Sequence, residues 1–167
     1  MTRPPTDQTT DQTTAPTTPA LEFAFAIRAE IAPPRSGGKS PLGERLHIPI
    51  TGGTVTGPRL RARILPGGSD WPLITPDGTS KICADYTIEA EDGTLILVHN
   101  EGLRASSAEV LARLRAGEKV RPEEFYFRCA PRFDVGDGPH AWLRSTLFVG
   151  SIAPQGNVIE IDVFAVT

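Results

Sequence analysis

The chain has few residues of the types that bind metals or form disulfides. Its 167 residues include two cysteines, Cys83 and Cys129, and three histidines. Both cysteines fall inside predicted strands far apart in sequence, so we expect free buried thiols. His47, His99 and His140 lie on separate segments, and no pair has the spacing of metal ligands. We therefore expect no metal site, although paired strands can bring distant residues together.

Long apolar runs and an excess of positive charge are also missing. No run approaches the roughly 18 apolar residues that a membrane helix needs. No charged segment followed by an apolar core indicates a signal peptide, so we expect a cytoplasmic protein without a membrane partner. The net charge of −3 gives no basic face for nucleic acid.

Sequence motifs that would announce a familiar catalytic chemistry are absent as well. The chain contains no Gly-x-Ser-x-Gly nucleophile elbow, no phosphate-binding loop and no dinucleotide fingerprint. We expect no cofactor.

The first residues have a composition unlike the rest. Residues 1–20 consist mainly of Thr, Pro, Asp and Gln, and TDQTTDQTT is nearly a duplication. Such a segment buries too little apolar surface to offset its ordering entropy, so we predict a disordered tail. Residues 21–167 then form one domain.

Alternation of apolar and polar residues predicts strands through most of this domain. The predicted strands cover residues 21–31, 45–51, 59–65, 81–91, 94–100, 124–133, 141–150 and 158–166. One short helix is predicted over residues 106–117, with Ser106 and Glu109 as a capping box. The pattern indicates an all-β protein, either a sandwich or a barrel, of about eight or more strands.

Three spaced segments carry a family resemblance: ITGGTVTGPRLRARILPGGSDWPLITPDG, ADYTIEAEDGTLILVHNEG, and YFRCAPRF followed by WLRSTLFVG. They resemble the bacterial and fungal family known as domain of unknown function 3237, from about Leu21 to the C-terminus. The resemblance implies a single closed antiparallel barrel of calycin type, and it implies little about chemistry. A barrel of about eight strands can hold one small ligand.

Two charged residues in the middle of apolar strands are the first candidates for a catalytic site. Asp85 lies beside Tyr86, and Arg128 lies between Phe127 and Phe133 of its predicted strand. If both face the interior, each needs a partner, and an Asp85–Arg128 pair meets both needs. The alternative is that both point to solvent or form a purely structural pair.

Further candidates surround this pair. Asp70 and Trp71 follow the turn at Pro66-Gly67-Gly68, where they could wall a pocket, or cap a loop and cover the core. Trp142 and Arg144 share a face of a predicted strand, and Trp142 either contacts a ligand or fills the core. Tyr86, Tyr126 and His99 complete the predicted substrate-binding set. The row Arg59, Arg61 and Arg63 is typical of a solvated face.

These residues leave several function classes open. One hypothesis is a cofactor-free isomerase, cyclase or lyase for a small apolar or aromatic molecule, with Asp85, Arg128 and Asp70 as catalytic residues. A second is a carrier or sensor that binds the same molecule without turnover. A third is a structural subunit whose strand edges pair, and edges of this kind also suggest a homodimer or larger homo-oligomer.

Overall fold

A computed structural model describes residues 17–167 of the chain. The strands are β1 (Leu21–Ile31), β2 (Arg35–Ser40), β3 (Gly43–Thr56), β4 (Arg61–Ile64), β5 (Gly68–Asp70), β6 (Leu73–Ile74), β7 (Ser80–Ala90), β8 (Leu95–Ser106), β9 (Phe125–Asp134), β10 (Phe148–Gln155) and β11 (Val158–Val166). The helices are α1 (Ala108–Arg115) and the short 3-10 helices η1 (Pro122–Glu124) and η2 (Ala141–Ser145).

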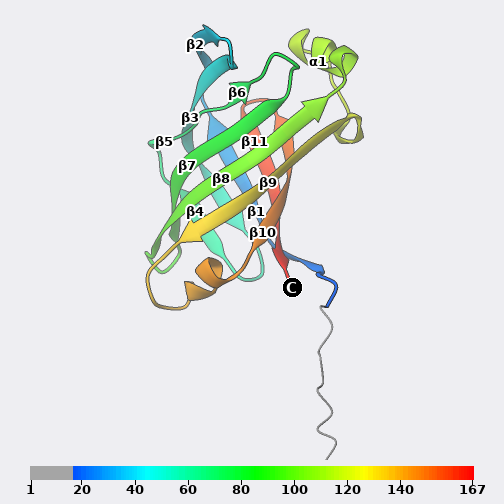
Figure 1. Ribbon diagram of the computed structural model, residues 1–167. Helices are drawn as coiled ribbons and strands as arrows, with labels where there is room; N and C mark the ends of the chain where they lie inside the picture. The colour runs from blue at the N-terminus through cyan, green and yellow to red at the C-terminus, as the bar shows by residue number, and fades with distance from the viewer. Residues whose placement is uncertain (1–16) are drawn as a thin grey trace, which may run out of the picture.

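The strands form a closed antiparallel barrel, as the family resemblance implies (Figure 1). Neighbours follow the order β1-β11-β10-β9-β8-β7-β4-β3, and pairing of β1 with β3 closes the ring. β5 and β6 continue the line of β4 between β3 and β7, while β2 extends β3 outward. No helix within residues 17–167 is long and apolar enough to cross a membrane.

A bulge in β1 changes which side chains of this strand reach the core. The sequence places Leu21 and Phe23 on the same face as Phe25. The pairing of β1 with β11 shifts between Phe23 and Phe25, so Ala24 and Phe25 are both buried while Leu21 and Phe23 are exposed. An extra residue in one strand reverses the alternation that follows it.

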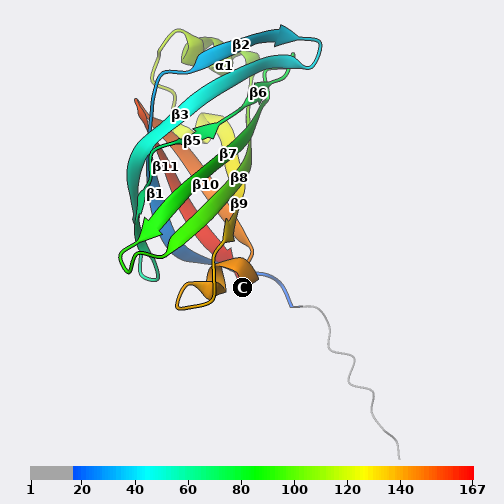
Figure 2. The ribbon, with the colours of Figure 1, turned by 90° about the vertical axis from the view of Figure 1, so that its left-hand side faces the viewer.

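One end of the barrel is filled by aromatic packing. Phe25 makes edge-on contacts with Phe133 and Trp142, and Phe148 packs against the same group. Trp142 belongs to η2, which lies across this end (Figure 2). The predicted strand over residues 141–150 is therefore wrong in its first half, and β10 begins only at Phe148.

Glycines permit close strand approach where the sequence predicts a turn. β3 continues through Gly52-Gly53 instead of ending there. Gly53 has a φ of 134°, and a Cβ at this position would lie 2.0 Å from the carbonyl oxygen of Arg28 on β1. Only glycine fits this conformation and this distance.

The helix begins later than predicted. β8 runs to Ser106, so the expected capping box of Ser106 with Glu109 does not form. Ser107 accepts a hydrogen bond from the Val110 amide through its hydroxyl at 3.2 Å instead. The helix α1 lies at the end of the barrel opposite η2 (Figure 1).

Candidate active site in the barrel interior

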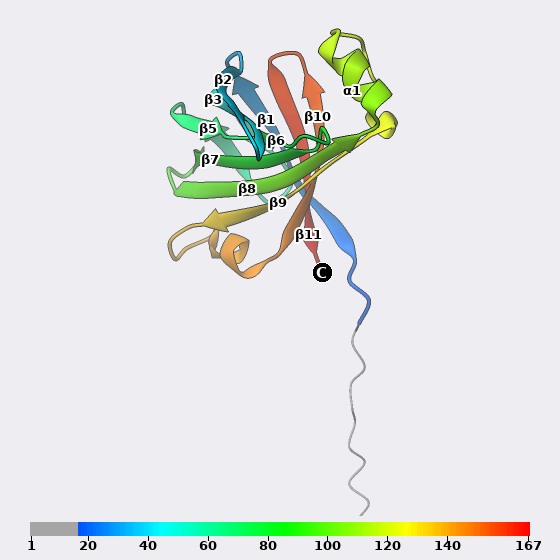
Figure 3. The same cartoon turned by 45° about the horizontal axis from the view of Figure 1, so that its top comes forward.

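A cavity of about 370 Å3 lies inside the barrel, in the half away from the aromatic cluster around η2. Figure 3 looks toward this end of the barrel, where the β10–β11 turn and β2 lie. Most of the wall is aliphatic, from residues such as Leu46, Ile82 and Ile159. The volume is within the range of roughly 300–1,000 Å3 usual for small-molecule sites.

Of the described residues, Asp70 is the one with a carboxylate that lines this cavity. It ends β5, which fits between β3 and β7 because Gly68 has no side chain; a Cβ there would lie 2.4 Å from the Cβ of Tyr86. The carboxylate accepts a hydrogen bond from the Cys83 amide at 3.1 Å. Burial raises the pKa of Asp70, and the backbone amides and Arg104 only partly oppose this.

Arg104 places a cation in the same cavity. It is the inward residue near the end of β8, and it donates from Nη2 to the hydroxyl of the buried Ser80 at 3.4 Å. Its guanidinium also lies 5.8 Å from the ring centre of Phe127. The carboxyl group of Asp70 and the guanidinium group of Arg104 thus share one apolar cavity.

Two buried polar groups at the cavity have no hydrogen-bond partner within residues 17–167. They are the hydroxyl of Tyr86 on β7 and the side-chain oxygen of Asn100 on β8. Burial raises the pKa of Tyr86, so its hydroxyl stays protonated as a donor. Buried polar groups are rarely left unpaired, and a bound polar molecule would satisfy them.

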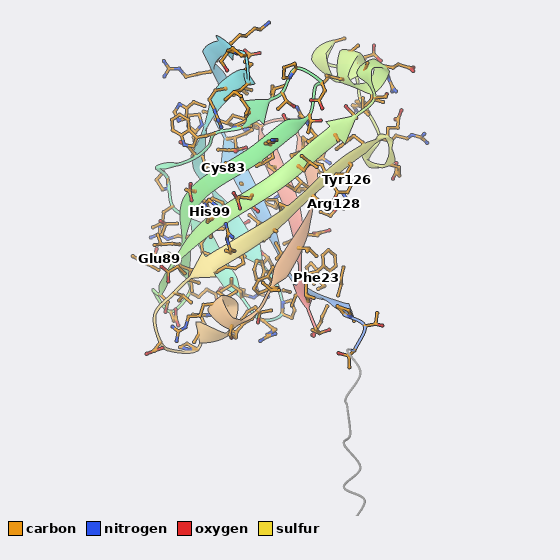
Figure 4. All side chains as sticks on the ribbon, in the orientation of Figure 1. Phe23, Cys83, Glu89, His99, Tyr126 and Arg128 are labelled. Atoms are coloured by element: carbon orange, nitrogen blue, oxygen red, sulfur yellow. The ribbon has the colours of Figure 1, made fainter. Side chains whose placement is uncertain are left out.

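The structure brings two of the predicted site residues, Asp70 and Tyr86, to the cavity and not the others. The expected Asp85–Arg128 pair is wrong. The Asp85 side chain is 64% exposed and bonds to His99 at 2.6 Å. Arg128 is exposed on β9, beside Tyr126. Both strands turn their apolar face inward, which sends Asp85 and Arg128 outward, as Figure 4 shows for Arg128.

The remaining candidates also lie outside the cavity. The ring of Trp71 stacks on the ring of His47 on the outer surface, with 4.2 Å between the ring centres. Trp142 packs in the aromatic end with the Arg59 guanidinium 3.7 Å above its ring. Arg144 pairs with Asp137 and donates to the Val135 carbonyl. His99 and Tyr126 are on the outer faces of β8 and β9, and Tyr126 is 53% exposed.

The residues missed by sequence reasoning are Ser80, Asn100 and Arg104. A usable signal exists for the last two, since they continue the inward alternation of Ile96 and Val98 along β8. The predicted strand ended at residue 100, so Arg104 was not placed on it. Ser80 stands one residue before the predicted strand and gives no such signal.

Comparison with known proteins agrees with this class of fold, a closed antiparallel barrel. Residues 19–166 match the family described as "Protein of unknown function (DUF3237)". The chain is 40% identical over 151 residues to a UPF0311 protein of Rhodopseudomonas palustris, covering 89% of this chain and 99% of that protein. The chain belongs to the DUF3237 family.

Solved structures show the same fold. A crystal structure of a conserved protein of unknown function from Rhodopseudomonas palustris aligns with a TM-score of 0.84 at 37% identity, over 92% of this chain and all of that one. An enzyme from Penicillium herquei aligns with a TM-score of 0.68 at 23% identity, over 92% of this chain and 98% of that one. The second likeness concerns the fold alone.

Proposed function

We propose that the barrel binds a small, mainly apolar or aromatic molecule and moves a proton on it without a cofactor. The observation that supports this most is Asp70, a carboxyl group with a raised pKa facing an aliphatic cavity. Burial raises the pKa of such a group, which makes its ionised form a stronger base and keeps its protonated form available as an acid to higher pH.

Each polar residue of the cavity has a role in this scheme. Protonated Asp70 donates to a basic atom of the substrate, or ionised Asp70 removes a proton from an acidic carbon or hydroxyl. Arg104 stabilises negative charge that develops on a substrate oxygen. The unpaired groups of Tyr86 and Asn100 orient the substrate by hydrogen bonds. In an isomerisation Asp70 takes a proton from one substrate atom and returns it to another; in an elimination it returns the proton to the leaving group, which departs with the electrons of the broken bond.

The enzyme from Penicillium herquei supports the proposal only in that a barrel of this shape can host catalysis. A fold does not define a function, so residues of this chain carry the chemistry. The alternative function is a carrier or sensor, because the same aliphatic walls and orienting groups bind a ligand equally well without turnover.

A panel of aromatic ketones and phenols in D2O tests the proposal. Nuclear magnetic resonance would report both binding, by line broadening, and catalysis, by deuterium incorporation or a rearranged product. Asp70→Asn keeps the size and one acceptor of the side chain but removes the titrating group. We expect it to bind as before and to lose turnover by roughly 10²–10⁴-fold.

Asp85→Asn is the matched control, since it makes the same change on the outer surface. It should keep full turnover. Equal losses in the two variants would contradict the assignment of Asp70. Binding in the wild-type protein without turnover of any compound would favour the carrier.

A further inference from the structure

A group of metal-ligand side chains lies on the outer face of β7 and β8, opposite the barrel cavity. Cys83 and Asp85 alternate along β7, and His99 lies on β8 directly across from Asp85. One ligand atom from each residue lies within 4.8 Å of the others. Figure 4 shows Cys83 and His99 on these neighbouring strands.

The spacing of these three donors is close to what a metal ion requires. Ligand atoms around a tetrahedral zinc ion are about 3.3–3.8 Å apart, given metal–ligand distances of about 2.0–2.3 Å. Small side-chain rotations would bring the donors to that spacing, because Cys83 and His99 are only half-buried and Asp85 is exposed. The His99 and Asp85 atoms, which are 2.6 Å apart, must separate slightly. The strands themselves hold the donors in register and need not move.

Around His99 the geometry resembles the support that metal-bound histidines usually have. The Nδ1 atom of His99 lies 2.6 Å from the Asp85 carboxylate, so Nδ1 is the nitrogen directed toward the other proposed metal ligands. Nε2 lies 3.8 Å from Oε1 of Glu101, whose other oxygen pairs with Arg132 at 2.8 Å. A histidine that binds a metal through one nitrogen commonly directs the other N–H toward a carboxylate.

The donor types indicate which ions suit the group. A thiolate, an imidazole and a carboxylate favour a borderline ion such as Zn²⁺ over Mg²⁺ or Ca²⁺, which prefer oxygen ligands. A thiol binds such an ion as the thiolate, so binding releases the thiol proton.

We propose that Cys83, Asp85 and His99 bind one Zn²⁺-class cation, with water in the fourth position. The open position faces solvent at the edge of a surface groove of about 570 Å3, which Asp85 and His99 help to line. The site does not rest on the proposed function, since its three donors are on the outer face of the wall, although the Asp70 carboxylate accepts a hydrogen bond from the Cys83 backbone amide at 3.1 Å.

Cobalt(II) is the probe that reports the donors directly. The full-length protein, stripped with a chelator and kept reduced with a phosphine, would be titrated with CoCl2 and followed by absorption. We expect a near-ultraviolet thiolate-to-cobalt band together with the intense visible bands of four-coordinate Co²⁺. Excess Zn²⁺ should bleach both.

Variants separate this site from general surface binding. Cys83→Ser should abolish the thiolate band, and His99→Gln should weaken cobalt binding by more than tenfold. Glu101→Gln, which alters the group supporting His99, should cost about tenfold. Cys129→Ala and His140→Gln are the controls; the latter changes a second His–Asp pair, which joins His140 and Asp92 at 3.1 Å.

Circular dichroism on each variant would confirm that it is folded before the titration. Absence of the thiolate band in the wild-type protein, or its survival in Cys83→Ser, overturns the proposal. So does a spectrum of six-coordinate cobalt alone, since that indicates binding to surface carboxylates.

Discussion

At the scale of single residues, Asp70 should reduce the stability of the protein at neutral pH. Its pKa is raised by burial, so the folded state favours the protonated form. The stabilising effect of the proton is complete below the ordinary pKa of 3.8 and is lost as pH rises through the folded-state pKa. Above that point an ionised carboxylate remains in an aliphatic cavity.

Asp70→Asn removes this charge while keeping the shape of the side chain. We therefore expect a higher melting temperature than wild type at pH 7, and a difference that shrinks as the pH approaches 4 (about the ordinary carboxyl pKa). Thermal unfolding at several pH values measures both. A variant that is less stable at pH 7 would show that Asp70 stabilises the fold rather than being strained by it.

Sequence reasoning identifies Asp70 and Tyr86 but not Arg104, the cation at the same cavity. Asp85 and Arg128 looked like interior residues because apolar neighbours flank them. In both strands those neighbours are the inward residues, so strict alternation already predicts the outward position of the charges. To predict that Arg104 points inward, one must know that β8 continues to Ser106. The sequence does not indicate this length, because no turn residue marks the end of the strand.

At the scale of elements, α1 is attached to the barrel through charged side chains. Arg113 on the helix pairs with Glu124 at 2.6 Å, and Glu124 also accepts from the Arg121 amide at 2.9 Å. Arg113 lowers the pKa of Glu124 to about 2 from an ordinary value of 4.5. The stability from this contact is present above pH 4.5 and is lost as pH falls toward 2.

Glu124→Gln should loosen the connection between α1 and β9 without affecting the barrel. Hydrogen exchange is expected to speed up across residues 107–124, while the strands keep their protection. Glu123→Gln is the control, because it changes an exposed neighbour with no such contact among those described. Faster exchange throughout β8 and β9 would mean that the helix supports the barrel itself.

The elements themselves were largely predictable, and their ends were not. Alternation locates β1, β7, β9 and β11, since one face of each is apolar. It fails at residues 141–147, where Trp142 and Leu143 are buried by a 3-10 helix instead of a strand. It also fails between β4 and β6. There a Pro- and Gly-rich segment forms short, interrupted strands because it pairs with both β3 and β7.

At the scale of the whole molecule, closure of the barrel changes the case for oligomers. The expectation of a homo-oligomer rested on strand edges that need covering. β1 pairs with both β11 and β3, so the ring itself leaves no such edge. Exposed apolar side chains remain near one end, including Phe23, Leu147 and Val149. The homodimer therefore remains a prediction, which now depends on these exposed apolar side chains instead of on unpaired strand edges.

Closure also defines where the domain begins. The predicted boundary lies after Ala20, yet Ala20 and Thr167 exchange two backbone hydrogen bonds at 2.8 and 3.0 Å. These bonds extend the β1–β11 ladder by one residue beyond Leu21 and Val166. The family match begins at residue 19, which agrees with a domain that includes this pair.

Two truncations test this boundary. Removing residues 1–17 should leave the melting temperature unchanged within error, because the composition of that segment gives it little apolar surface to bury. Removing residues 1–20 also breaks the pair with Thr167. Each lost hydrogen bond contributes about 0.5–1.5 kcal/mol, and each kcal/mol lowers the melting temperature of a domain of this size by about 2–4 °C. Deleting Thr167 alone should reproduce that loss, whereas a drop of many degrees after the shorter truncation would show that the removed segment packs on the barrel.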